Sequence, residues 1–255
     1  MGRSSGTQQP PGGLHFGCMR VSPWGRVVIA SALLVVGGAL ALTVWDYGSR
    51  TQQLVSYPVS GSLNGVAFDV GDAAITIVGG GTRSDVDVQR RERFSFGHAA
   101  ETRRMVAGGV FRVESRCPAT LPDSCSVRYR VVVPDNVPVE VATGSGAVRL
   151  ERYRGSARVT TRSGDVDVDG FCGFSLRATA QSGDVTARAA CAPQRMVLRT
   201  STGSVHAIVP AGRYQLDAQS ASGRQVVRGV SSTPDAPFSI QALSSAGDVL
   251  VERAS

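Results

Sequence analysis

The 255-residue sequence predicts an all-β fold, namely a repeat-built β-solenoid or two-sheet roll preceded by one N-terminal transmembrane helix. Three observations predict it. A glycine-centred turn recurs at regular spacing, apolar and polar residues alternate after each turn, and one uncharged apolar run lies near the N-terminus. Composition agrees, because 42% of the residues are hydrophobic, only 6% are aromatic and 30 are glycine. A core of Val, Ala, Leu and Ile between closely spaced turns is typical of β structure.

The apolar run covers residues 27–44, which carry no charge. At about 1.5 Å per residue, a helix of this length spans about 27 Å, close to the thickness of the hydrocarbon core of a bilayer. Trp24 and Trp45 bracket the run, and indole rings prefer the membrane interface. We therefore expect residues 21–47 to form a transmembrane helix that contacts the lipid bilayer through residues 24–45.

Charge asymmetry predicts the orientation of this helix. Arg3, Arg20 and Arg26 precede the run and Asp46 follows it. Because basic residues are retained on the cytoplasmic side, the N-terminus is expected to be cytoplasmic. The C-terminal domain is then extracytoplasmic, at the cell membrane.

The predicted layout assigns the remaining segments. Residues 1–20, rich in Gly, Ser, Gln and Pro, are expected to form a disordered cytoplasmic tail. Residues 48–60 are expected to be a linker, and residues 61–255 an extracytoplasmic β-repeat domain. A cleaved secretory signal is the alternative, since Ala39-Leu40-Ala41 offers a small-residue cleavage pattern, although that pattern falls inside the apolar run.

The most specific signal is an internal repeat of the form Ser/Thr-x-Ser/Thr-Gly-x-Val, in which a turn precedes a strand. Its glycines are Gly146, Gly164, Gly183, Gly203, Gly223 and Gly247. Their spacings of 18, 19, 20, 20 and 24 residues leave room for two short strands and two turns. Apolar residues alternate after each glycine, as at Val166 and Val168, so one face of each strand is expected to be buried.

We expect these repeats to stack and share a dry interior that none could enclose alone. Small residues recur nine positions after the turn glycine, as at Gly155 and Gly173, where the chain must bend again. An antiparallel sandwich is the alternative architecture. Upstream, residues 66–70, 74–78, 86–88 and 110–113 are expected to form further strands. The Arg-rich residues 89–105 show no apolar alternation and are expected to form a long exposed loop.

Four cysteines lie on the side predicted to be outside the cytoplasm, and this even number indicates two disulfides. Cys172 and Cys191 each follow a turn glycine by eight residues, so they occupy equivalent positions in consecutive repeats. If repeats stack about 4.8 Å apart, their Cα separation falls in the window of roughly 4.4 to 6.8 Å that a disulfide tolerates. We predict a Cys172–Cys191 bond that clamps two repeats and a Cys117–Cys125 bond that closes a hairpin loop. Zinc is not expected, since no Cys-x-x-Cys occurs.

Residues 129–141, followed directly by the Ser-Gly-x-Val repeats, resemble a large bacterial family whose members are known as "putative adhesins" or as β-strand-repeat proteins of unknown function. The resemblance covers residues 60–253. It implies an all-β repeat domain displayed at the cell envelope, often after one transmembrane helix, with no established active site to carry over.

Motifs that suggest chemistry have simpler interpretations. Asp165, Asp167 and Asp169 mimic the start of a calcium loop, but strand alternation points all three to solvent, and a leucine stands where the loop needs glutamate. Asp184 and Asp248 recur at the turn position of Asp165, which suits side chains that accept hydrogen bonds from nearby backbone amides. Residues 79–81 are all glycine, but a phosphate-binding loop needs a lysine, and the chain has none. We expect no enzyme, no cofactor and no metal.

Net charge argues against a nucleic-acid partner. All 27 basic residues are Arg, and three of them precede Asp46, so the rest of the chain carries 24 Arg against 20 acids. So small an excess over many strands is typical of a solvated surface. Teichoic acid and lipid headgroups stay open as anionic partners.

The sequence therefore favours a membrane-anchored, non-catalytic cell-envelope module for adhesion or for binding an envelope polymer or a partner protein. The candidate ligand surface is a set of repeated, solvent-facing arginines: Arg158, Arg162, Arg177, Arg188 and Arg199. One alternative is a sensory or regulatory ectodomain coupled to a cytoplasmic partner. Another is a carbohydrate-cleaving β-helix, which would need clustered carboxylates, calcium and a basic catalyst in one groove.

Overall fold

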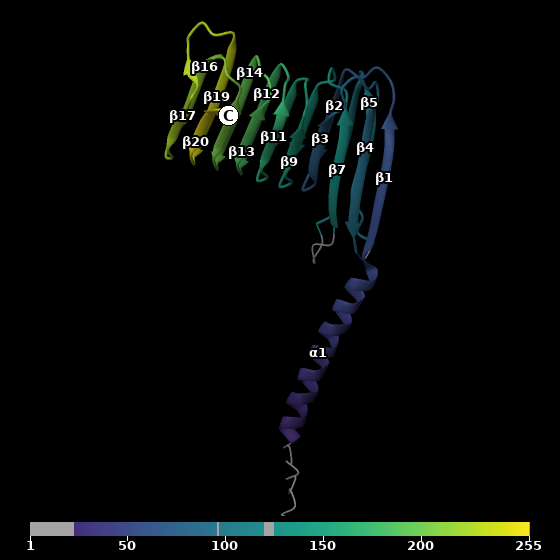
Figure 1. Cartoon of the computed structure of the whole chain (residues 1–255). Coiled ribbons are helices and arrows are strands. Elements are labelled where there is room, and N and C mark those ends of the chain that lie inside the picture. Colours follow the sequence, from purple (N-terminus) through teal and green to yellow (C-terminus); the bar gives the residue numbers. More distant parts are fainter. Residues whose placement is uncertain (1–22, 96, 120–124, 255) are drawn as a thin grey trace, which may run out of the picture. The chain divides into compact units, whose positions relative to one another are not determined.

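The computed structural model describes residues 23–95, 97–119 and 125–254, and these divide into two compact units between Gly48 and Ser49. The first unit contains most of the helix α1, Pro23–Ser49 (Figure 1). Within α1, the stretch Val27–Trp45 is long and apolar enough to cross a membrane, and its side chains are exposed. Because the helix is apolar on all sides, it has no polar face to turn toward water.

The second unit consists of two ten-stranded sheets (Figure 1). The first sheet contains, in spatial order, β1 (Thr51–Val59), β4 (Val86–Phe94), β7 (Cys125–Val133), β3 (Ala74–Gly79), β9 (Val148–Glu151), β11 (Val166–Phe171), β13 (Val185–Ala189), β15 (Val205–Val209), β20 (Val249–Arg253) and β17 (Gln225–Arg228). The second contains β18 (Ser231–Ser232), β16 (Arg213–Ser220), β19 (Phe238–Ala246), β14 (Arg195–Thr202), β12 (Ser175–Ser182), β10 (Ala157–Thr161), β8 (Val139–Thr143), β2 (Gly65–Val70), β6 (Val110–Arg116) and β5 (Glu101–Ala107).

Each repeat forms one rung, with a strand in the second sheet, a glycine turn and a strand in the first sheet. Neighbouring rungs pair in parallel, so equivalent residues form straight rows. Val159, Ala178 and Leu198 make one such row, and all three are fully buried between the sheets. The period-two alternation therefore marks the buried face, and the predicted β-solenoid is confirmed in place of the antiparallel sandwich. Antiparallel pairing occurs only where β1, β4 and β5 join the first end of the sheets, among the described strands.

The repeat glycines lie in one column. A Cβ on Gly164 would lie 2.2 Å from the carbonyl oxygen of Gly146, and a Cβ on Gly203 would lie 2.2 Å from that of Gly183. Real Cβ contacts are never that short, so these turns can stack only if the position has no side chain. The alignment of the glycine turns in a row, on which the stacking prediction depended, is present.

A hydroxyl three residues before the turn glycine, present in every repeat except that of Gly183, where Ala180 takes its place, explains the first position of the motif. Thr161 Oγ1 accepts a hydrogen bond from the Gly164 amide at 2.8 Å, within its own turn. Thr200 Oγ1 donates to the carbonyl oxygen of Gly183 in the neighbouring turn at 2.9 Å. Because these hydroxyls are largely buried, they satisfy backbone groups that water cannot reach.

The order of the last two repeats departs from simple succession. The rung β19–β20 lies between β14–β15 and β16–β17, although it follows both in the chain. The end rung is β16–β17. The 24 residues from Gly223 to Gly247 give the chain enough length to form β18 on the outer side of β16 and then return to form β19 on its inner side. A rung is also out of sequence order at the first end, where β2–β3 lies between β6–β7 and β8–β9. Stacking of successive units therefore holds for the middle repeats and not for the ends.

Three segment predictions are wrong. The expected linker 48–60 contains β1, which pairs with β4 along its whole length. The expected loop 89–105 contains most of β4 and most of β5. The Cys117–Cys125 bond forms with a Cα separation of 5.7 Å, but it joins the end of β6 in the second sheet to β7 in the first, so it does not close a hairpin. Only residues 86–88 of β4 were expected to form a strand, because inward-facing residues of its later part, Arg90 and Glu92, are charged.

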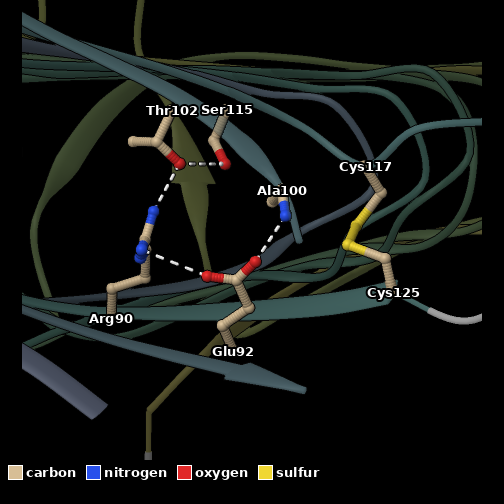
Figure 2. The surroundings of a disulfide bond; sticks show 7 residues. All are labelled: Arg90, Glu92, Ala100, Thr102, Ser115, Cys117 and Cys125. Atoms are coloured by element: carbon tan, nitrogen blue, oxygen red, sulfur yellow. Dashed lines mark hydrogen bonds and ion pairs between the residues drawn. A yellow bond between two sulfur atoms is a disulfide. The ribbon is translucent and has the colours of Figure 1, made fainter. Parts of the chain in front are cut away.

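Beside that disulfide, a polar cluster bridges the two sheets (Figure 2). Glu92 of β4 is 1% exposed and lies 3.1 Å from the guanidinium of Arg90. Its carboxylate also accepts a hydrogen bond from the backbone N–H of Ala100. Arg90 in turn donates to Thr102 Oγ1 at 2.5 Å, and Thr102 lies 3.3 Å from Ser115 Oγ on β6. A buried ion pair thus replaces apolar packing at this end of the interior.

The Cys172–Cys191 bond joins the ends of β11 and β13, which are adjacent strands of the first sheet. The Cα separation is 4.7 Å, as stacking of equivalent positions requires. The disulfide therefore clamps two neighbouring rungs.

Candidate functional site

The five arginines singled out from the sequence do not share one face. Arg158, Arg177 and Arg199 project from the outer face of the second sheet, because each lies between two buried residues of its strand. Arg188 projects from the first sheet, 3.0 Å from Asp169. Arg162 lies in the glycine turn after β10. The structure therefore brings three of the five together.

Strand register aligns two of these three, Arg158 and Arg177, with further charges, whereas Arg199 lies one outward position farther along its strand, opposite Thr179. Outward residues of neighbouring strands form a straight row in which Glu140 lies beside Arg158 and Arg158 beside Arg177. Two strands beyond Glu140, past Ala67, the same row holds Arg112. Since strands in a sheet are about 4.8 Å apart, Glu140, Arg158 and Arg177 follow one another at that spacing, and Arg112 lies two spacings from Glu140.

A groove runs beside this row, toward the starts of the strands. Small residues at the neighbouring outward positions, Gly65, Ser156 and Ser175, leave space that the long arginine side chains border. The groove consists of two adjoining hollows of about 580 and 470 Å³, which share Arg177 and Arg195 in their walls. We call it the arginine groove and define it by Arg112, Arg158, Arg177, Arg195 and Arg199.

Two of these residues, Arg112 and Arg195, were missed in the sequence. Arg112 lies upstream of the glycine repeats, but it stands between the apolar Phe111 and Val113, and that alternation could have placed it on an outer face. Arg195 opens β14 before any alternation begins, so only the register with Ser175 reveals its position.

The groove is electropositive. Its lining contains five arginines and two acids, Glu140 and Asp217. Gln241 connects one arginine to one acid, since it accepts a hydrogen bond from Arg199 at 2.5 Å and donates one to Asp217 at 2.9 Å. Within the described chain, the other four arginines have no carboxylate within 4.0 Å and are exposed. The lining includes no aromatic side chain.

The aspartates that resembled a calcium loop have other partners. Asp165 Oδ1 accepts a hydrogen bond from the Asp184 amide in the next turn at 2.9 Å, and Asp184 Oδ1 accepts one from the Ser204 amide at 2.7 Å. Asp167 lies 3.2 Å from Arg149. These carboxylates therefore cap the turn of the following rung or form surface ion pairs. No cluster of three metal-ligating side chains was found among the described residues.

The same capping at Asp248 predicts a pH dependence. The backbone N–H of Arg224, followed by its guanidinium, lowers the pKa of the Asp248 carboxyl below the ordinary value of 3.8. Because the folded-state pKa is the lower one, this contribution is present above pH 3.8 and is lost as the pH falls through the folded-state value. We expect the stability difference between wild type and Asp248→Asn to shrink below about pH 4. Thermal melting of both proteins from neutral to acidic pH tests this, and parallel curves would contradict it.

Comparison with known proteins agrees with the fold. Residues 124–228 match the Toastrack family DUF4097. A "putative cell adhesion protein" from Clostridium sporogenes ATCC 15579 aligns over 80% of this chain and 100% of its own, with 11% identity and a TM-score of 0.48. A "putative adhesin" from Bacteroides fragilis NCTC 9343 aligns over 79% and 97%, with 14% identity and a TM-score of 0.44. No curated protein matches the sequence. The match to the Toastrack family therefore covers the segment from β7 to β17, and the flanking strands continue the same two sheets.

Proposed function

We propose that this chain is a membrane-anchored, non-catalytic module of the cell envelope that binds an anionic envelope polymer through the arginine groove. The observation that carries the proposal is the groove itself, with four exposed arginines that have no acidic partner among the described residues, three of which, Arg112, Arg158 and Arg177, lie in one row across parallel strands. Guanidinium groups bind phosphate and carboxylate groups through paired hydrogen bonds. A row that crosses several rungs suits an extended partner with repeated negative charges.

The composition of the groove favours charged over neutral ligands. Protein sites for uncharged small molecules are lined mainly by apolar and aromatic groups, and this lining has no aromatic residue. Glu140, the carboxylate of the lining that has no hydrogen-bond partner among the described residues, lies between arginines of the row. No histidine lines the hollows to act as a general acid or base. The groove is thus suited to hold an anion and offers little to cleave one.

The location is supported by two independent features. The exposed apolar stretch Val27–Trp45 suits a bilayer anchor. Two disulfides in the β domain suit an oxidising compartment, outside the cytoplasm. Together they favour a domain displayed on the outer side of the membrane and tethered by its N-terminal helix.

We expect Arg158→Gln/Arg177→Gln to weaken binding of a phosphate polymer such as teichoic acid about tenfold, because two exposed charge contacts of about 0.7 kcal/mol each are removed. Binding of the full chain in detergent to teichoic acid, to a uronate polymer and to neutral dextran is the measurement. Arg188→Gln on the opposite sheet is the matched control and should bind as wild type does.

Binding should also weaken as salt rises, since exposed charges are screened. Equal binding by the double variant and by wild type would reject the groove as the site. Binding of dextran as tight as that of the two anionic polymers would reject the proposed ligand class.

A further inference from the structure

A second group of arginines lies on the first sheet, at the end where the chain enters from α1. There β4 pairs antiparallel with β1 on one side and β7 on the other, and outward side chains align across the three strands. One row places Leu54 opposite Arg91, and Arg91 opposite Arg128. The rows on either side contain Arg93 and Arg130. We call Arg91, Arg93, Arg128 and Arg130 the entry-end arginines.

The entry-end arginines are exposed and have no acidic partner. None has a carboxylate within 4.0 Å in the part of the chain that the structure describes. The outward positions of the three rows, 52, 54, 56, 89, 91, 93, 126, 128 and 130, hold no acid. Farther along the same sheet, by contrast, Arg149 pairs with Asp167 at 3.2 Å and Arg188 with Asp169 at 3.0 Å.

This arrangement costs stability in the isolated domain. Like charges directly opposite each other on antiparallel strands repel, and Arg91 and Arg128 are such a pair. An acid at any outward position nearby would relieve the repulsion. A face that keeps four unpaired guanidinium groups is therefore complementary to an anionic surface outside the domain.

Chain length fixes how far this face can lie from the end of the apolar stretch. From Trp45 to the end of α1 at Ser49 the helix rises about 6 Å. Residues 50–52 add at most about 3.5 Å each, so Gln52 lies within about 16 Å of Trp45, whatever the orientation of the two units. Arg93 is directly opposite Gln52. If Trp45 marks the edge of the hydrocarbon, the headgroup layer covers the next 5 to 8 Å or so, Gln52 lies within about one Debye length beyond it, and the backbone of Arg93 lies at most one strand spacing, about 5 Å, farther.

We propose that the entry-end arginines bind the phosphates of anionic phospholipid headgroups, so that the first end of the solenoid rests on the membrane that anchors it. This proposal depends on the membrane anchor of the proposed function and adds a lipid partner to it. Basic residues next to a membrane anchor are attracted to anionic lipid, and Leu54, 62% exposed in the same row, offers an apolar contact to the interface. An end held in this way would leave the groove on the other sheet free for polymer.

The test is arginine footprinting of the full chain in lipid nanodiscs. Phenylglyoxal modifies accessible guanidinium groups, and peptide mass spectrometry reads each arginine separately. We expect Arg91, Arg93 and Arg128 to react about fivefold more slowly in nanodiscs that contain phosphatidylglycerol than in pure phosphatidylcholine, and high salt to remove the difference. Arg149 and Arg188, already paired on the same sheet, serve as internal controls and should not change.

A second measurement separates lipid binding from folding. In phosphatidylcholine, Arg91→Gln/Arg128→Gln should melt at or above the wild-type temperature, because a like-charge pair is removed. The rise in melting temperature that phosphatidylglycerol gives the wild type should be lost in this variant. The groove variant Arg158→Gln/Arg177→Gln should keep that rise.

Each contrary outcome has one meaning. Equal footprints in the two lipids, from chains that have entered the nanodiscs, would overturn the lipid contact and leave the proposed function intact. Protection by added teichoic acid in phosphatidylcholine, without protection by phosphatidylglycerol, would assign the face to polymer and also overturn it. A chain that fails to enter nanodiscs would contradict the anchor, and the lipid contact would fall with it.

Discussion

Replacing Gly164 by alanine is expected to lower the free energy of unfolding by at least about 3 kcal/mol, the upper part of the range for overpacked interiors. The new methyl group would lie 2.2 Å from the carbonyl oxygen of Gly146. That oxygen belongs to the backbone of the neighbouring turn and cannot rotate away. The two rungs would have to separate locally, which would weaken the parallel hydrogen bonds on both sides. Chemical denaturation of the purified chain, followed by circular dichroism, measures the change.

Gly65→Ala is the matched control for that experiment. Gly65 opens β2 and is buried, but a Cβ there would lie 3.6 Å from its nearest neighbour, an ordinary contact. We therefore expect a change of less than about 1 kcal/mol, of either sign. If both variants lost the same stability, loss of backbone freedom would be sufficient to explain the result, and the stacked glycine column would not be the cause.

Replacing Arg90 by methionine is expected to lower the free energy of unfolding by about 3 kcal/mol or more, because the change leaves a buried carboxylate without its cation. Glu92 is 1% exposed, and the guanidinium of Arg90 lies 3.1 Å from it. The backbone N–H of Ala100 alone would then compensate the charge. Urea denaturation at neutral pH measures the loss.

The double variant Arg90→Met/Glu92→Leu tests the cause. Replacing both members of a buried pair by apolar residues removes the charge and its desolvation cost together, so most of the lost stability should return. Arg149→Met, which breaks an exposed pair with Asp167, should cost less than about 1 kcal/mol. Additive losses in the double variant would show that shape, and not charge, holds this end of the interior.

Both predictions concern features that the sequence reveals to different degrees. The glycine column follows from the repeat, because a residue that recurs every rung must meet its equivalent in the next one. The Cys172–Cys191 clamp follows in the same way. The Arg90–Glu92 pair does not follow from the repeat. Hydropathy predicts an exposed loop wherever charged side chains are frequent, and in β4 two charged side chains face the interior.

The groove shows the same division. Alternation alone turns Arg158 and Arg177 outward, but it does not say to which of the two sheets an outward residue belongs. Arg188 differs from them only in coming after its glycine turn, in the strand of the first sheet. Arg195 could be assigned to the groove only from its register with Ser175, which the structure supplies.

The sequence by itself determined the rung: its length, its glycine turn, its buried face and the disulfide between equivalent positions. These are local or periodic properties, and each is fixed by sterics within one repeat or between identical positions. Only the tertiary structure decided the order of the rungs at the two ends, where β19–β20 is inserted beside β14–β15, and which arginines share a face. The physical reason is that every rung offers the same apolar interior and the same glycine turn. Any rung can therefore stack on any other, and the lengths of the connections and the closure of the ends select among them.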